Sequence, residues 1–133
     1  MTKDLPPDFK VPGFLAAGIP AGIKKNQEKD LALIYSEVSS KAAGVFTTNR
    51  VKAAPVLLSK ERIRSGRARA ILINSGSANA CTGKRGLADG LHLSRLIATS
   101  LRIPPQDVLL RRVYNQRQRR SDQGFRYQRW RVF

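Results

Sequence analysis

The chain has 133 residues, 41% of them hydrophobic, and its 25 Lys and Arg against 9 Asp and Glu give a formal net charge of +16. This length predicts one modest domain, and the hydrophobic fraction excludes an intrinsically disordered chain. A single cysteine, Cys81, and a single histidine, His92, exclude an internal disulfide and a multi-cysteine metal cluster, and they leave little for zinc or for a Ser-His-Asp arrangement.

The first third of the chain predicts extended segments. Residues 11–23 are apolar and small, and three glycines together with Pro20 argue against a regular helix, so we expect a tightly packed extended segment. Residues 31–38 and 42–48 hold aliphatic, aromatic and β-branched side chains in short bounded runs. These two runs predict an antiparallel pair of strands.

The middle of the chain predicts a short helix followed by a buried strand. Pro55 suits the first turn of a helix over residues 56–63, and Gly66 ends that helix. Residues 68–73 form a compact apolar run that leads into a cluster of Gly, Ser and Asn. That pattern is typical of a buried strand feeding a loop.

A second helix is predicted from Arg85 onward by its periodicity. Spacings of four and three residues align one set of side chains along a single helical face, namely Leu87, Leu91, Ser94, Ala98 and Leu101. Pro104 and Pro105 end this helix, and residues 107–110 predict the start of another strand. Strands mixed with intervening helices predict an α/β fold of layered strands and helices.

The segment 74–86, between a predicted strand and a predicted helix, is the most distinctive in the chain. A phosphate-binding loop needs four residues between its glycines and a Ser or Thr after its lysine. Here six residues separate Gly76 from Gly83, and Arg85 follows Lys84, so the nucleotide-binding interpretation fails. Two interpretations stay open: small side chains that let a ligand approach amides before a helix, or a tight connection whose Asn side chains satisfy the local backbone.

Three further sets of residues that could carry out catalysis or binding have ordinary structural explanations. Cys81 acts as a nucleophile only with a base beside it, and the sole histidine is eleven residues away, so a small buried or loop thiol is favoured. His92 neighbours the apolar face and is favoured as a packed or partly exposed helical residue. Thr47 and Thr48, followed by Asn49, offer hydroxyls that a strand end or a turn explains equally well.

The composition changes abruptly near Arg111. Residues 111–133 hold eight Arg, no Lys and one acid, Asp122, and they contain no Leu, Ile or Ala. Arginines alternate there with aromatic residues such as Trp130, which suits phosphates and unpaired bases. The match is unspecific, because an accident of composition gives the same pattern.

The hydropathy of the chain predicts a cytoplasmic location. No run approaches the roughly 18 apolar residues that a membrane span needs. Residues 1–8 contain no apolar stretch of the signal-peptide type. We therefore expect no membrane partner, and from the composition no metal and no cofactor.

Five segments carry a family resemblance. They are GFLAAGIPAGIKK at residues 13–25, DLALI at 30–34, AAGVFTTN at 42–49, VKAAPV at 51–56 and INSGSANACTG at 73–83. In this order they resemble the amino-terminal portion of the bifunctional ornithine acetyltransferase / N-acetylglutamate synthase family of arginine biosynthesis. The resemblance covers about residues 9–110, with Ser77 standing where the family usually has a second Asn.

The resemblance implies a cytoplasmic enzyme that moves an acetyl group from N-acetylornithine to glutamate, with acetyl-CoA also accepted by some members. The family precursor cuts itself before a threonine, which becomes the amino-terminal nucleophile of a second fragment in a hetero-oligomer. A freed amine on that residue can take the hydroxyl proton and activate the nucleophile. The acyl-enzyme then needs hydrogen-bond donors for its oxyanion.

The catalytic groups implied by the family have no counterpart in this chain. Its oxyanion donors come from a Thr-Gly pair after a Val-Leu strand, whereas here residues 108–110 are followed by Arg-Arg-Val-Tyr-Asn-Gln. We therefore assign no catalytic residue and expect a truncated, inactive fragment. The chain divides into an acetyltransferase-like segment, 1–110, and an Arg-rich tail, 111–133, that is disordered or out of frame. A shift of reading frame is our hypothesis for the abrupt change.

Two other interpretations stay open. The chain is alternatively a small basic protein that binds nucleic acid through its Arg and aromatic tail. It is otherwise a structural subunit that docks onto a partner fragment. An incomplete sheet would expose unpaired strand edges, so we expect low solubility or association unless a partner covers them.

Overall fold

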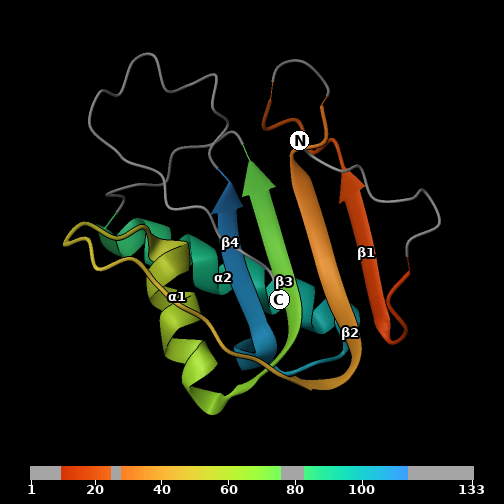
Figure 1. Cartoon of the computed structure of the whole chain (residues 1–133). Helices are drawn as coiled ribbons and strands as arrows, with labels where there is room; N and C mark the ends of the chain where they lie inside the picture. Colours follow the sequence, from red (N-terminus) through yellow and green to blue (C-terminus); the bar gives the residue numbers. More distant parts are fainter. Residues whose placement is uncertain (1–9, 25–27, 76–82, 114–133) are drawn as a thin grey trace, which may run out of the picture.

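The computed structural model describes residues 10–24, 28–75 and 83–113. Four strands form one sheet with the order β1-β2-β3-β4, and two helices accompany it (Figure 1). The strands are β1 (Phe14–Ile19), β2 (Leu31–Lys41), β3 (Arg67–Ser75) and β4 (Val108–Val113). The helices are α1 (Ala54–Arg62) and α2 (Gly83–Leu101), with short 3-10 turns η1 (Ile63–Ser65) and η2 (Pro105–Asp107). The predicted α/β class is confirmed.

The sheet is antiparallel at one side and parallel at the other. β2 pairs antiparallel with both β1 and β3, and an irregularity in the register lies between Tyr35 and Ser40. β3 and β4 run parallel, from the pair Ala70 and Val108 to the end of each strand. Parallel neighbours need a crossover connection, and α2 supplies it behind the sheet (Figure 1). The predicted strands over 31–38, 68–73 and 107–110 are confirmed as β2, β3 and β4.

The predicted pairing of 31–38 with 42–48 is wrong. Residues 42–48 form no strand, and both edges of β2 are occupied by β1 and β3. The amide of Ala42 still donates to the carbonyl of Gly66 at 2.9 Å, which extends the pairing of β2 with β3 by one step. The chain beyond it runs to the start of α1 (Figure 1). The partner of a strand depends on distant residues, which local composition does not specify.

The extended conformation predicted for residues 11–23 is confirmed for their central part only, and these residues are not tightly packed. Their central part is β1, and five of its six residues are exposed because β1 is the first strand of the sheet. The short helix predicted over 56–63 is confirmed as α1 with Pro55 in its first turn. It continues into η1, which ends at Gly66 with φ at 69°, a left-handed conformation that favours glycine.

The predicted second helix is confirmed as α2, but its buried face is built from smaller residues than expected. Its buried residues recur every four positions, namely Gly86, Gly90, Ser94 and Ala98. Leu87, assigned to the buried face from the sequence, is 36% exposed. A Cβ on Gly90 would lie 2.7 Å from Cδ1 of Leu58 and 3.3 Å from Cδ1 of Leu110. Glycine at this position therefore lets α2 approach both α1 and β4.

The core lies between the sheet and the two helices. Its buried members are Leu58, Ala70, Leu72, Ala98, Ile103, Val108 and Leu110. Side chains of β2, including Leu31, Leu33 and Tyr35, are packed against this cluster from one side. Burial of apolar surface at roughly 25 cal/mol per Å² is the main contribution that holds these layers together. The core fixes β3 and β4 side by side, and with them the carboxyl ends of both strands.

Candidate functional site

The carboxyl ends of β3 and β4 lie at the same edge of the sheet because the two strands are parallel. The register pairs Asn74 with Arg112 and Ser75 with Val113 at the last two positions. Ligands of α/β proteins bind preferentially beyond the carboxyl ends of parallel strands. The distinctive segment 74–86 begins at this edge, which is therefore our candidate site.

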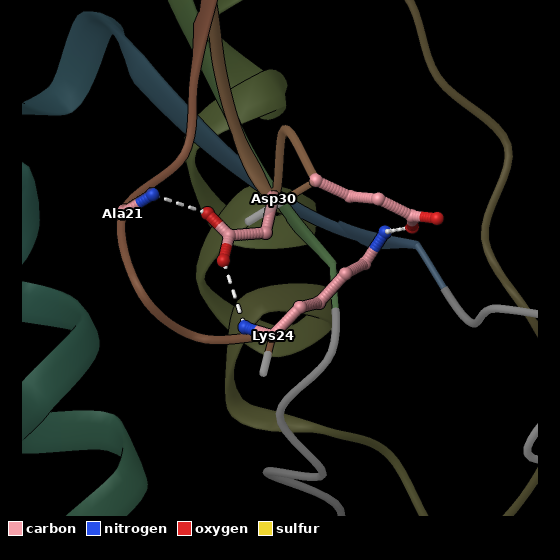
Figure 2. A network of polar contacts seen from close by, with 4 residues as sticks. Ala21, Lys24 and Asp30 are labelled. Atoms are coloured by element: carbon pink, nitrogen blue, oxygen red, sulfur yellow. Dashed lines mark hydrogen bonds and ion pairs between the residues drawn. The ribbon is translucent and has the colours of Figure 1, made fainter. Parts of the chain in front are cut away.

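Asp30 is the one buried carboxylate near this edge among the residues that the structure describes, and it is 3% exposed. Figure 2 shows its two oxygens accepting hydrogen bonds from the segment that follows β1. The amide of Ala21 donates to Oδ1 at 2.6 Å, and the amide of Lys24 donates to Oδ2 at 2.8 Å. These hydrogen bonds hold the pKa of Asp30 below its ordinary value of 3.8, and burial opposes them in part. Asp30 is therefore ionised near neutral pH and is a poor general base.

The backbone of Asp30 joins the same turn to the end of β3. Its amide donates to the carbonyl of Ile19 at 3.1 Å, and its carbonyl accepts from the amide of Ser75 at 2.8 Å. One residue thus connects the end of β1, the start of β2 and the end of β3. Asp30 thus fixes the position of Ser75 at the end of β3.

Lys24 places a positive charge on this turn. Its Nζ lies 3.1 Å from Oε2 of Glu28, and Figure 2 marks this contact with a dashed line at the end of the Lys24 side chain. The two residues are four positions apart, and the Glu28 side chain is 53% exposed. An exposed ion pair of this kind adds little stability.

The strand beside β3 is held from its other side by α1. The hydroxyl of Ser59 donates to the carbonyl of Leu110 at 2.7 Å and accepts from the amide of Leu110 at 2.9 Å. Two residues earlier on β4, the carbonyl of Val108 accepts from Nη1 of Arg62 at 2.5 Å. Three backbone groups that β4 turns away from β3, the carbonyl of Val108 and both groups of Leu110, are therefore satisfied by α1.

Arg62 also ties α1 to α2. The same Nη1 donates to Oγ of Ser94 at 2.8 Å, and that hydroxyl donates to the carbonyl of Gly90 at 2.7 Å. Burial lowers the pKa of the Arg62 guanidinium, but an arginine stays protonated under any physiological condition. This buried chain of polar contacts fixes β4 relative to both helices and so fixes the edge at which it ends.

The candidates from the sequence are scattered rather than gathered at this edge. His92 is exposed on α2, which agrees with a helical residue. Thr47 accepts a hydrogen bond at its Oγ1 from the amide of Asn49 at 3.2 Å, so these residues form a turn. Thr48 is exposed. Cys81 and the rest of 76–82 lie outside the described residues, and so does the tail beyond Val113.

Asp30 was missed by the sequence reasoning, although it carries a usable signal. It directly precedes the apolar run Leu31–Ile34, so a charged side chain stands at the beginning of a half-buried strand. Buried carboxylates need hydrogen-bond donors, and a turn of small residues with free amides supplies them. β4 also continues to Val113, three residues beyond the boundary placed after Leu110.

Two classes of feature are absent from the part of the chain that the structure describes. No group of three or more His, Cys, Asp or Glu side chains is placed to hold a metal ion. No helix there has both the length and the apolar character to cross a membrane.

The segment that contains the candidate site has close relatives. A model of the ArgJ family matches residues 15–112. Two relatives named arginine biosynthesis bifunctional protein ArgJ are 55% identical over 98 residues, in Caldanaerobacter subterraneus subsp. tengcongensis, and 52% identical over 99 residues, in Synechocystis sp.. Each alignment covers 74% of this chain and 24% of the relative. The chain thus spans about a quarter of the length of these curated relatives.

Two solved structures are similar to this one. The crystal structure of arginine biosynthesis bifunctional protein ArgJ from Bacillus halodurans gives a TM-score of 0.72 at 41% identity. The match covers 79% of this chain and 56% of that chain. Ornithine acetyltransferase from Mycobacterium tuberculosis, solved as a complex with ornithine, gives a TM-score of 0.67 at 42% identity, over 77% of this chain and 56% of that chain.

Proposed function

Since this chain belongs to the ArgJ family, we propose that it serves acetyl transfer from N-acetylornithine to glutamate in arginine biosynthesis, with acetyl-CoA as a further acetyl donor. The observation that carries the proposal is the match over residues 15–112, which spans the four strands except Phe14 at the start of β1 and Val113 at the end of β4. The ornithine complex of the Mycobacterium tuberculosis relative supports ornithine derivatives as ligands. A cytoplasmic location belongs to the same proposal.

We propose that residues 1–110 act as scaffold rather than as the reacting groups. Asp30 and Ser75 fix one side of the candidate edge, and Ser59 with Arg62 fixes β4 at the other. Asp30 already accepts hydrogen bonds at both carboxylate oxygens, so it orients the turn and does not move protons. The nucleophile and the oxyanion donors then come from a second fragment and from the sequence that replaces residues 111–133 in family members.

This proposal predicts that the 133-residue chain alone does not transfer acetyl groups. Acyl transfer without a nucleophile and without oxyanion donors has no low-barrier path. The assay follows formation of N-acetylglutamate from N-acetylornithine and glutamate with the purified chain. Turnover that copurifies with this chain, after any full-length enzyme has been removed, would contradict the scaffold role.

The same proposal predicts that the scaffold is competent in a complete enzyme. The experiment grafts residues 15–110 of this chain onto the Caldanaerobacter relative in place of its matched residues, and this hybrid is called the graft. Identity of 55% over 98 residues makes the exchange conservative. The graft should transfer acetyl from N-acetylornithine to glutamate. A folded graft that binds neither compound would contradict the proposed function.

A further inference from the structure

Among the residues that the structure describes, no strand pairs with the outer edge of β1, whereas α1 contacts the edge at the other end of the sheet. The amide of Glu37 donates to the carbonyl of Gly13, directly opposite it in the register. Hydrogen-bonded and non-bonded pairs alternate along antiparallel strands, so Leu15, Ala17 and Ile19 turn their backbone groups toward β2. The even residues of β1 turn theirs away. The amide of Phe14 donates to the carbonyl of Val11. The amides of Ala16 and Gly18 therefore remain as the ones that face outward.

The helix layer is incomplete in the same place. Leu15 and Ile19 stand opposite Tyr35 and Leu31, which pack against the core between the sheet and the helices. Cross-strand partners share a face, so Leu15 and Ile19 also project on the helix side. They are nevertheless 57% and 54% exposed. Figure 1 shows β1 as the outermost strand on the side away from α1.

The opposite edge of the sheet is partly covered by α1. There the carbonyl of Val108 accepts from Arg62, and both backbone groups of Leu110 bond to Ser59, as described above. Exposed edges with apolar side chains are sites at which another strand pairs, and natural proteins normally block those they do not use. Within the described residues, α1 covers the edge of β4 at Val108 and Leu110, and the edge at β1 is left open.

We propose that β1 is an interior strand in the assembled enzyme. A strand from the remaining polypeptide of the family pairs with the backbone of Ala16 and Gly18. The segments attached to that strand cover the side chains of Leu15 and Ile19. This inference rests on the proposed function. The occupant is chosen by length: about three quarters of each curated relative lies outside the matched segment, enough for several further strands and helices. A second copy of this chain is the alternative occupant that the test distinguishes.

Amide hydrogen exchange tests the proposal at single residues. The rates at Ala16 and Gly18 are compared in the isolated 133-residue chain and in the graft, with Ala17, which bonds to β2, as the internal control. Both outward amides should exchange fast in the isolated chain and slow by about a hundredfold or more in the graft, because strand pairing makes exchange depend on local opening. If the graft is insoluble, the exchange rates are measured instead in the full-length Caldanaerobacter relative, at the two residues that align with Ala16 and Gly18.

Every other result overturns the proposal. Equal, fast exchange in both proteins means that nothing pairs with β1 in the enzyme. Slow exchange in the isolated chain that depends on protein concentration means that a second copy occupies the edge, and slow exchange without that dependence means that the chain covers its own edge. An active graft with unprotected amides refutes the edge proposal alone, whereas an inactive graft with protected amides refutes the proposed function alone.

The substitution Ala16→Pro provides a second measurement. Proline removes an outward donor without breaking a bond to β2, and edge strands tolerate it. The melting temperature of the isolated chain should therefore change little. In the graft the same substitution should lower the yield of soluble, assembled enzyme at least tenfold. Equal effects in both proteins would contradict a strand paired at this edge.

Discussion

The hydroxyl of Ser59 and the backbone of Leu110 exchange two hydrogen bonds, one accepted by the carbonyl at 2.7 Å and one donated by the amide at 2.9 Å. A single side chain of α1 thus takes the place of a neighbouring strand at the outer edge of β4. Both residues are buried, so water does not replace these bonds if the hydroxyl is removed. The pair closes one end of the sheet and fixes the strand that leads into the candidate site.

Ser59→Ala should destabilise the chain by about 1–3 kcal/mol, because it leaves a buried amide and a buried carbonyl without partners. Urea unfolding measures the change. Ser65→Ala is the matched control, since the hydroxyl of Ser65 also bonds backbone groups but is exposed. The control should change the unfolding free energy by less than about 0.5 kcal/mol. Equal effects of the two substitutions would show that the edge of β4 is not sealed in this way.

Gly90→Ala should destabilise the chain, although alanine is the better helix former. A Cβ at this position would lie 2.7 Å from Cδ1 of Leu58, closer than carbon atoms approach in folded proteins. Overpacking of this kind costs about 1–3 kcal/mol, against a gain in helix propensity of up to about 1 kcal/mol. Thermal unfolding of the variant measures the balance of the two effects.

Leu58→Ala provides the background that isolates the steric effect. With the Leu58 side chain shortened, the added methyl group at position 90 has room, and Gly90→Ala should then be neutral or stabilising. The reversal of sign between the two backgrounds is the expected signature of contacting residues. Destabilisation of the same size in both backgrounds would refute the close approach of α1 and α2 at Gly90.

Asp30→Asn should lower the unfolding midpoint near neutral pH, because an amide accepts at one atom only and cannot satisfy both Ala21 and Lys24. The pKa of Asp30 is depressed on folding, so its contribution is present above about 3.8, the ordinary value, and is lost as pH falls through the lower folded value. The difference between wild type and variant should therefore shrink below that pH. Asp89→Asn, on the exposed surface of α2, should shift the midpoint little at any pH.

The regular elements could largely be predicted from local patterns. Pro55 and Gly66 bracket α1, the apolar run at 68–73 is β3, and Pro104 follows the end of α2. The family resemblance carried by five segments is confirmed by the match over residues 15–112. These predictions succeed because they depend on signals within about ten residues of each element. At that range, helix and strand propensities and the Pro and Gly residues that begin or end an element decide the structure.

The errors concern contacts between residues far apart in the sequence. The run at 42–48 has strand-like composition, but β2 finds its partners in β1 and β3 instead. Leu87 fits the apolar period of α2, but Gly90 determines which face approaches Leu58 and β4. The role of Asp30 depends on the turn at Ala21, nine residues earlier, which places an amide against its carboxylate. Each of these outcomes depends on tertiary packing, which periodicity alone does not encode.

The measurement that most directly tests the scaffold role is the rate of N-acetylglutamate formation from N-acetylornithine by the graft, relative to the parent Caldanaerobacter enzyme and to the isolated chain. The account predicts a kcat/KM within about tenfold of the parent, because each tenfold loss corresponds to only about 1.4 kcal/mol of transition-state stabilisation. It predicts no turnover by the isolated chain. A folded graft without activity, or an isolated chain with activity of its own, would contradict it.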